Sequence, residues 1–309
     1  MTDKFQRDIF IDEIYNAALN DRDIYFISAD FGAPSLDKFR DKLPNQFIHS
    51  GISEQHMIDM AAGLALSNKK VYLYAMAPFI TLRCLEQIKC SLSMMNLPVT
   101  ILAVGVGLGY ADAGPTHYAN EDVACLRSLP GIEIFSISDE ITAKAIAQNT
   151  LNEPKFRIIR MERHALPQIH SKVIDSINNG FEVLNKGNKV CILSYGHLLH
   201  RAKLALEILN KEEKNIGLID VYRFKPLSKN LLTELNKYES LITIEEQCLD
   251  GGFGSCILEF LNKNKILKNI DRMGLPERYF FENGGREYLL DTFGLSVDDI
   301  VNRIKINNI

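Results

Sequence analysis

Residues 99–137 read VTILAVGVGLGYADAGPTHYANEDVACLRSLPGIEIFSI. The stretch begins with an apolar, β-branched run (99–104) and continues through a glycine-rich loop into a helical segment. It ends in a second apolar run (132–137). Short strands that are apolar on both faces and are joined by a helix are typical of a parallel sheet covered on both sides. This part of the chain therefore predicts an α/β fold.

The same alternation extends outward in both directions. Ser53 is a residue type that commonly caps a helix, and the acidic Glu54 follows it in the first turn, so a helix is expected to start there. The other apolar runs are short, and the amphipathic runs between them are longer. The pattern predicts strands at 24–28, 71–75 and 156–161 and helices at 10–19, 53–67, 82–95 and 139–151.

A second strand–helix series begins near residue 189. It predicts strands at 189–195, 216–221 and 241–246 and helices at 201–210, 228–238 and 253–264. This order implies a mainly parallel sheet with right-handed crossovers. The stretch between the two series has little periodicity and contains Pro167, Gly180 and Gly187. We therefore expect a first domain at 1–170, a linker at 171–188 and a second domain at 189–309.

The composition is that of an ordinary globular protein. Of 309 residues, 46% are hydrophobic and 24% are charged, and the formal net charge is −4. These values argue against a disordered chain and against nucleic-acid binding driven by phosphate neutralisation. No apolar run is long enough for a membrane span, and the start, MTDKFQRDIF, lacks the apolar core of a signal peptide. The six cysteines form no C-x-x-C pair, so we expect a protein of the reducing cytoplasm.

Three short motifs place chemically capable side chains beside expected helices. They are Glu54 in GISEQHM, Phe79 in FITLRCLEQ and His117 in GPTH. Taken singly, each has an ordinary structural explanation. An acidic residue in a first helical turn complements the helix dipole, Gly-Pro marks a turn, and an aromatic residue beside an amphipathic helix packs in a core.

Together, in this order and at these intervals, the motifs resemble the transketolase family of thiamine diphosphate enzymes. The resemblance covers nearly the whole chain. It rests on SADFGAPS (28–35), GISEQHM (51–57), GPTH with the following ED and LRSLPGI (114–132), RMERHALPQI (160–169), DVYRFKPL (220–227) and EEQCLDGGFGS (245–255). It implies a pyrimidine-binding domain, with a parallel sheet and helices on both faces, followed by a transketolase C-terminal α/β domain.

The resemblance also implies a site. Glu54 would hydrogen-bond the N1′ nitrogen of the cofactor's aminopyrimidine, and His117 would act on the donor oxygen whose charge changes. Phe79 would stack on the pyrimidine, and Arg83 would line the same pocket. The residues expected to contact a sugar-phosphate substrate are Arg163, Ser35, Arg7 and Asp112.

One domain of the family is missing from this sequence. The diphosphate- and metal-binding domain is marked by Gly-Asp-Gly, which does not occur here, and Asp250-Gly251-Gly252 is no substitute. The chain therefore resembles the C-terminal subunit of a split transketolase that transfers a two-carbon ketol unit. A partner chain would hold the diphosphate and Mg²⁺, and we expect two copies of each chain, with a homodimer when this chain is alone.

Three positions depart from the usual family pattern. Ala113 stands where transketolases have a substrate-contacting Asp, Tyr118 where a small polar residue is common, and Gly105 where many have a phosphate-contacting His. Asp112 is adjacent to the first position. A pocket without a partner for a hydroxyl group disfavours hydroxyl-rich substrates. We therefore expect donors that differ from those of the pentose phosphate pathway, such as a modified sugar or a short ketoacid.

Other functions remain open on the sequence. The β chain of a 2-oxoacid dehydrogenase also combines these two domains, and a pyruvate-using acyloin-type enzyme is a related alternative. 1-Deoxyxylulose 5-phosphate synthase shares the GIxEQH motif but normally keeps all three domains in one chain. A scaffold or regulatory subunit that has lost catalysis is the non-enzyme alternative.

Overall fold

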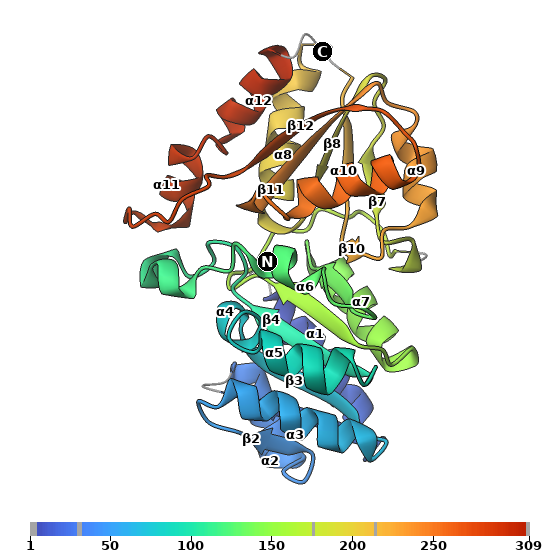
Figure 1. Cartoon of the computed structure of the whole chain (residues 1–309), viewed down its shortest axis with the longest axis vertical. Coiled ribbons are helices and arrows are strands. Elements are labelled where there is room, and N and C mark those ends of the chain that lie inside the picture. Colours follow the sequence, from blue (N-terminus) through green and yellow to red (C-terminus); the bar gives the residue numbers. More distant parts are fainter. Residues whose placement is uncertain (1–4, 30–32, 175–176, 213–214, 307–309) are drawn as a thin grey trace.

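Two layered α/β units are stacked along the long axis of the molecule (Figure 1). The computed structural model describes residues 5–29, 33–174, 177–212 and 215–306. Within SADFGAPS, residues 30–32 lie outside the described residues. The predicted α/β class, with one unit following the other along the chain, is confirmed.

The first sheet has seven strands in the part of the chain that the structure describes. Every neighbouring pair is parallel except β10 and β5. In spatial order the strands are β10 (Arg223–Lys225), β5 (Glu133–Ser136), β6 (Arg157–Met161), β4 (Val99–Val104), β3 (Lys70–Met76), β1 (Ile24–Ser28) and β2 (Phe47–His49).

Alternation along the strands explains how both faces of this sheet are buried. In β3, Val71 and Leu73 join the same apolar cluster as α3, whereas Tyr72 and Tyr74 join the cluster that contains α1 and α7. The helices of this unit are α1 (Gln6–Ala18), α2 (Asp37–Lys42), α3 (Glu54–Leu66), α4 (Ala77–Ile80), α5 (Leu85–Gln87), α6 (Asp122–Leu126) and α7 (Glu140–Asn152).

Among the described residues, the second sheet has five strands, and only β7 runs antiparallel to its neighbour. In spatial order they are β12 (Asn269–Leu275), β11 (Ser240–Cys248), β8 (Val190–Ser194), β9 (Gly217–Asp220) and β7 (Glu182–Asn185). The helices are α8 (Gly196–Asn210), α9 (Lys229–Leu235), α10 (Phe253–Lys263), α11 (Gly285–Thr292) and α12 (Val297–Ile306). No helix in the described part of the chain is long and apolar enough to cross a membrane.

The sequence patterns did not predict β2, β12, α2, α11 or α12, and three further features differ from the prediction. The helix expected at 82–95 is the short α5 followed by a π-helical segment at Ile88–Ser93. The stretch expected as a linker contains β7, which pairs with β9. The three-residue β10 leaves the second unit and pairs with β5, so the two units share a sheet.

The apolar core is also continuous across the two units. Cys191, Phe224 and Phe253 of the second unit belong to the same buried cluster as Ile134 and Ile158 of the first. Burial of this shared surface stabilises the relative arrangement of the two units, because exposing it would cost roughly 25 cal/mol per Å².

Candidate functional site

Glu54 lies at the start of α3 and is 3% exposed. Ser53 occupies the cap position, but its hydroxyl donates to the Ser50 carbonyl at 2.5 Å and accepts no hydrogen bond from the helix amides. A buried carboxylate requires a hydrogen-bonding partner. Here Arg83 Nη1 donates to Glu54 Oε2 at 2.9 Å.

Phe79 and His117 complete this cluster. The Arg83 guanidinium lies over the Phe79 ring, with its central carbon 4.1 Å from the ring centroid. The rings of Phe79 and His117 meet edge to face at 5.0 Å between centroids. The structure therefore brings Glu54, Phe79, Arg83 and His117 together from three separate segments.

These contacts allow a test of whether an aminopyrimidine fits. The Arg83 group is planar, donates an N–H bond to Glu54 and stacks on Phe79. An aminopyrimidine is also planar, and once its ring nitrogen carries a proton it can make the same two contacts. The residues present thus fit the pyrimidine half of thiamine diphosphate.

Tyr110 belongs to the site although the sequence analysis did not select it. It lines a small cavity together with Glu54, Tyr74, Ala75, Met76, Phe79 and Val104. Glu54 comes from the start of α3, and the others come from the carboxyl ends of β3 and β4 and from the segments that follow them, where ligands bind in parallel α/β sheets. This strand-end position was the available sequence signal for Tyr74 and Met76.

Gly105 explains how Tyr110 reaches this position. Gly105 has a φ of +81°, and a Cβ atom there would lie 2.0 Å from a ring carbon of Tyr110. The Tyr110 ring therefore fills the space beside the position where the family commonly has a His. Burial raises the pKa of Tyr110, and Arg163 and Arg7 partly offset that rise.

The predicted substrate-contacting residues form a second group around Tyr110. The Arg163 guanidinium lies 4.6 Å from the Tyr110 ring centroid and forms an ion pair with Asp112. That ion pair lowers the pKa of Asp112. Asp112 is therefore engaged with Arg163 in this structure.

Arg7 and Ser35 meet at Asp8. The Ser35 hydroxyl donates to Asp8 Oδ1 at 2.8 Å, and Arg7 Nε lies 3.4 Å from the same oxygen. Burial raises the pKa of Tyr74 to about 12, with Arg7 acting in the opposite direction. Arg7 thus acts to lower the pKa of both cavity tyrosines, Tyr74 and Tyr110, whereas the Ser35 hydroxyl is bound to Asp8.

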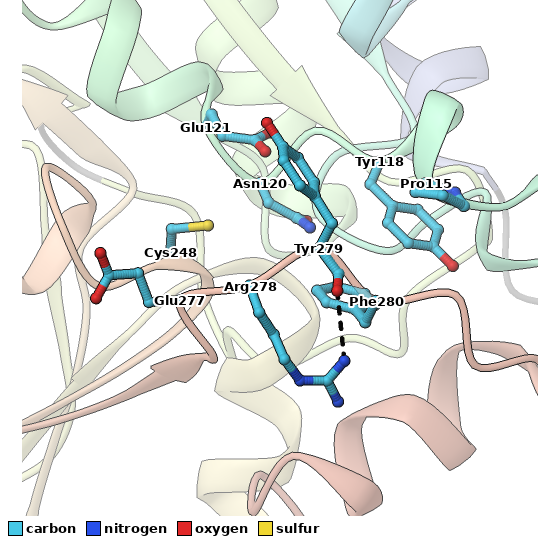
Figure 2. A pocket seen from close by; sticks show the side chains of 9 residues that line it. All are labelled: Pro115, Tyr118, Asn120, Glu121, Cys248, Glu277, Arg278, Tyr279 and Phe280. Atoms are coloured by element: carbon cyan, nitrogen blue, oxygen red, sulfur yellow. Dashed lines mark hydrogen bonds between the residues drawn. The ribbon is translucent and has the colours of Figure 1, made fainter.

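A larger cavity of about 450 Å³ lies between the two units (Figure 2). It is lined by Pro115, Tyr118, Asn120, Glu121, Cys248 and residues 277–280. None of the predicted site residues lines it. In the described segments, no group of three or more His, Cys, Asp or Glu side chains is arranged to hold a metal ion.

Comparisons with known proteins match the chain to two family profiles. The profile described as transketolase, pyrimidine binding domain, matches residues 6–168. The profile described as transketolase, C-terminal domain, matches residues 180–300.

Similar proteins fall into two groups by length. 1-Deoxy-D-xylulose-5-phosphate synthase of Bacillus licheniformis is 34% identical over 88% of this chain but only 43% of its own length. The chain thus spans less than half the length of that relative. A subunit of the apulose-4-phosphate transketolase of Phocaeicola vulgatus is 29% identical over 95% of this chain and 94% of its own length.

Solved structures also differ in how much of their own length matches this chain. A split gene transketolase, described as an inactive beta4 tetramer, superposes with a TM-score of 0.85 at 26% identity and covers 97% of both chains. Transketolase from Campylobacter jejuni superposes with a TM-score of 0.82 at 19% identity over 46% of that chain, which shows the fold alone.

Proposed function

The chain belongs to the transketolase family, and from that premise we propose that it is one subunit of a split, thiamine diphosphate-dependent transketolase. The contact of buried Glu54 with a planar cation stacked on Phe79 carries this proposal. The match to a transketolase subunit of nearly the same length supports it. In this proposal the subunit transfers a two-carbon ketol unit between sugar substrates.

Glu54 and Phe79 hold the pyrimidine half of the cofactor. Glu54 accepts a hydrogen bond from the ring, and its burial keeps that bond away from competing water. Phe79 supplies an aromatic face. When bound, thiamine diphosphate supplies the carbon nucleophile and the electron sink needed to cleave a carbon–carbon bond. In this proposal the ring takes the place of Arg83, which now contacts both Glu54 and Phe79.

His117 lies next to Phe79 in the proposed site. Its Nδ1 lies 3.0 Å from the Thr116 hydroxyl, and its ring edge meets Phe79. A half-buried imidazole in this place can donate a hydrogen bond to a substrate oxygen or move a proton near neutral pH. We assign it to the oxygen of the ketose carbonyl.

Arg163 and Arg7 form the anion-binding end of the site. Both partly offset the rise in the pKa of Tyr110 that burial causes. The Tyr110 ring centroid also lies 6.3 Å from that of His117. A planar guanidinium pairs well with a phosphate group. This arrangement supports a phosphorylated substrate that extends from His117 toward Arg163, with Ser35 and Asp112 at the edge.

The rest of the cofactor requires another chain. The proposed partner is an N-terminal transketolase subunit with a Gly-Asp-Gly motif that holds Mg²⁺ and the diphosphate. Two copies of each chain form the enzyme, and this chain alone forms a homodimer. All six cysteines are free, which supports a location in the reducing cytoplasm.

Glu54→Gln tests the proposal. The chain is purified together with a candidate partner, supplied with thiamine diphosphate and Mg²⁺, and assayed with phosphorylated ketose donors. We expect Glu54→Gln to lower kcat at least ~100-fold, because an amide cannot share a proton with the pyrimidine. Asp59→Asn, at an exposed position of the same helix, is the control. Near wild-type turnover in Glu54→Gln would remove Glu54 from this role.

A second candidate is a split enzyme related to 1-deoxy-D-xylulose-5-phosphate synthase. The identity of 34% to the Bacillus licheniformis protein favours it. The same assay separates the two functions by donor. Turnover with pyruvate and none with ketose phosphates would select the second candidate over a transketolase.

A further inference from the structure

The loop that carries Tyr110, Asp112 and His117 is closed on itself. Gly107 and Ala119 form an isolated antiparallel bridge, with N···O distances of 3.3 and 2.9 Å. The side chains of Tyr110, Asp112 and His117 are all carried between these two residues. The geometry at the base of this loop, residues 107–120, therefore determines where they stand.

Three consecutive residues of the second unit hold that base. Leu108 N donates to Glu246 Oε1 at 3.2 Å, and Gln247 Nε2 donates to the Ala119 carbonyl at 2.9 Å. The backbone N–H of Cys248 donates to the Asn120 carbonyl at 3.1 Å. The end of β11 thus binds the loop at both of its ends.

Glu246 fits closely against the loop backbone. Gly107 has a φ of +57°, and a Cβ atom there would lie 2.7 Å from the Glu246 carboxyl carbon. The apolar side of the loop packs in the same direction, because Leu108 and Ala111 belong to the buried cluster of the second unit.

Arg286 of α11 fixes Glu246 in turn. Its Nε donates to Glu246 Oε1 at 2.7 Å, and its Nη1 donates to Glu162 Oε2 at 2.6 Å. Glu162 follows β6 of the first unit, and Arg286 itself is nearly buried. Burial lowers the pKa of Arg286, but the two carboxylates raise it above its ordinary value overall. One cation therefore joins a carboxylate from each unit.

We propose that Glu246, held by Arg286, is a positioning residue that fixes the 107–120 loop and so places His117 against Phe79. The second unit would then contribute to catalysis without contacting substrate or cofactor. The kinetic part of this proposal rests on the proposed function, whereas the effect on the loop does not.

The first test measures hydrogen exchange in the intact chain. Glu246→Gln keeps an acceptor for Leu108 but cannot neutralise Arg286. Arg286→Lys keeps the charge but loses the two-pronged contact. In both variants we expect the amide hydrogens of Leu108, Ala119 and Cys248 to exchange at least ~10-fold faster than in wild type, with the exchange of α3 unchanged.

Glu259→Gln is the matched control. Glu259 forms an ion pair with Arg127 across the two units but does not contact the loop. Loop exchange that stays at the wild-type rate in Glu246→Gln and Arg286→Lys would overturn the proposal. So would equal acceleration in Glu259→Gln.

The second test uses the complex with the partner chain. A misplaced His117 should lower kcat by about 10-fold or more while the affinity for thiamine diphosphate, measured by calorimetry, changes less than about 2-fold. A merely structural role would lower kcat and cofactor affinity together, and that outcome would overturn the proposal. If the wild-type complex is inactive, the proposed function fails, and the exchange experiment still decides the role of Glu246.

Discussion

At the scale of single residues, Tyr110 and Gly105 illustrate how one position depends on another. The Tyr110 ring reaches the cavity because Gly105 has no side chain to obstruct it. Tyr110 then provides the surface on which Arg163 lies. The absence of a His at residue 105 is therefore linked to the presence of an aromatic residue at 110.

This linkage predicts non-additive effects on stability. Gly105→Ala should lower the free energy of unfolding by about 1–3 kcal/mol, because the new methyl group overlaps the Tyr110 ring and the backbone has a positive φ. In a Tyr110→Ala background the same substitution should cost less, since only the backbone strain remains. Urea denaturation of the two single variants and the double variant measures the difference. Equal costs in both backgrounds would show that the two residues are independent.

The sequence predicted part of this site and missed part of it. Glu54, Phe79, Arg83 and His117 were selected from motifs, and the structure places them in contact. Their proposed roles stay predictions. Tyr110 was missed because its position depends on a backbone conformation at Gly105 that no local pattern specifies.

At the scale of elements, a buried polar cluster connects the start of α7, the end of β9 and the segment between the two sheets. His170 Nδ1 lies 2.8 Å from Asp139 Oδ2, and His170 Nε2 lies 3.5 Å from Asp220 Oδ2. Asp139 caps α7, Asp220 ends β9, and His170 lies in the segment between the two sheets. The Ser138 hydroxyl donates to Asp220 at 3.0 Å.

Burial raises the pKa of Asp220 to about 7, although His170 and Ser138 act to lower it, and Asp139 and Glu182 add to the rise. Burial lowers the pKa of His170, but its two carboxylate neighbours raise it overall. In both cases the folded state binds a proton that the unfolded state has released, so stability decreases as pH rises. Burial raises the pKa of Asp139, but His170 lowers it overall, and that contribution is lost only in acid.

Asp220→Asn should flatten the pH dependence of stability. An amide can still accept from Ser138 but has no proton to release. We expect the free energy of unfolding to decrease less between about pH 5 and pH 8 than it does in wild type. Urea denaturation at several pH values measures the slope, and Asp59→Asn at an exposed position is the control. Identical slopes in wild type and Asp220→Asn would contradict this assignment.

Elements with strong local patterns were predicted well, and those that depend on distant partners were not. The predicted strand at 99–104 matches β4, and the predicted helix at 139–151 matches α7 within a residue. The strands β2, β7, β10 and β12 were missed, and these four strands form the edges of the two sheets. Such strands depend on the neighbour that they pair with more than on their own sequence.

At the scale of the whole molecule, the two units are joined by buried charge as well as by apolar surface. Arg160 of β6 pairs with Asp122 at 2.8 Å, and both side chains are almost fully buried. The guanidinium lies 5.5 Å from the Tyr195 ring centroid and 5.7 Å from that of Phe224, both in the second unit. The ion pair therefore lies where the two units meet.

Asp122→Asn should destabilise the whole molecule. It leaves the Arg160 charge buried without its partner, which typically costs about 3–5 kcal/mol. Thermal unfolding should show a lower midpoint, by about 5 °C or more, and adding Arg160→Met should recover part of the loss. Glu259→Gln removes an ion pair whose carboxylate is exposed and should have little effect. A midpoint unchanged by Asp122→Asn would show that this pair contributes nothing to the junction.

The crossing strand β10 has a consequence for how such chains can be recombined. Arg223 and Lys225 of the second unit align with Phe135 and Ile134 of the first. In a chimeric gene joined between the two family profiles, β5 from one relative would have to pair with β10 from another. Substitutions in either strand must stay compatible with the other, so we expect exchange of both units together to preserve the fold better than exchange of one unit alone.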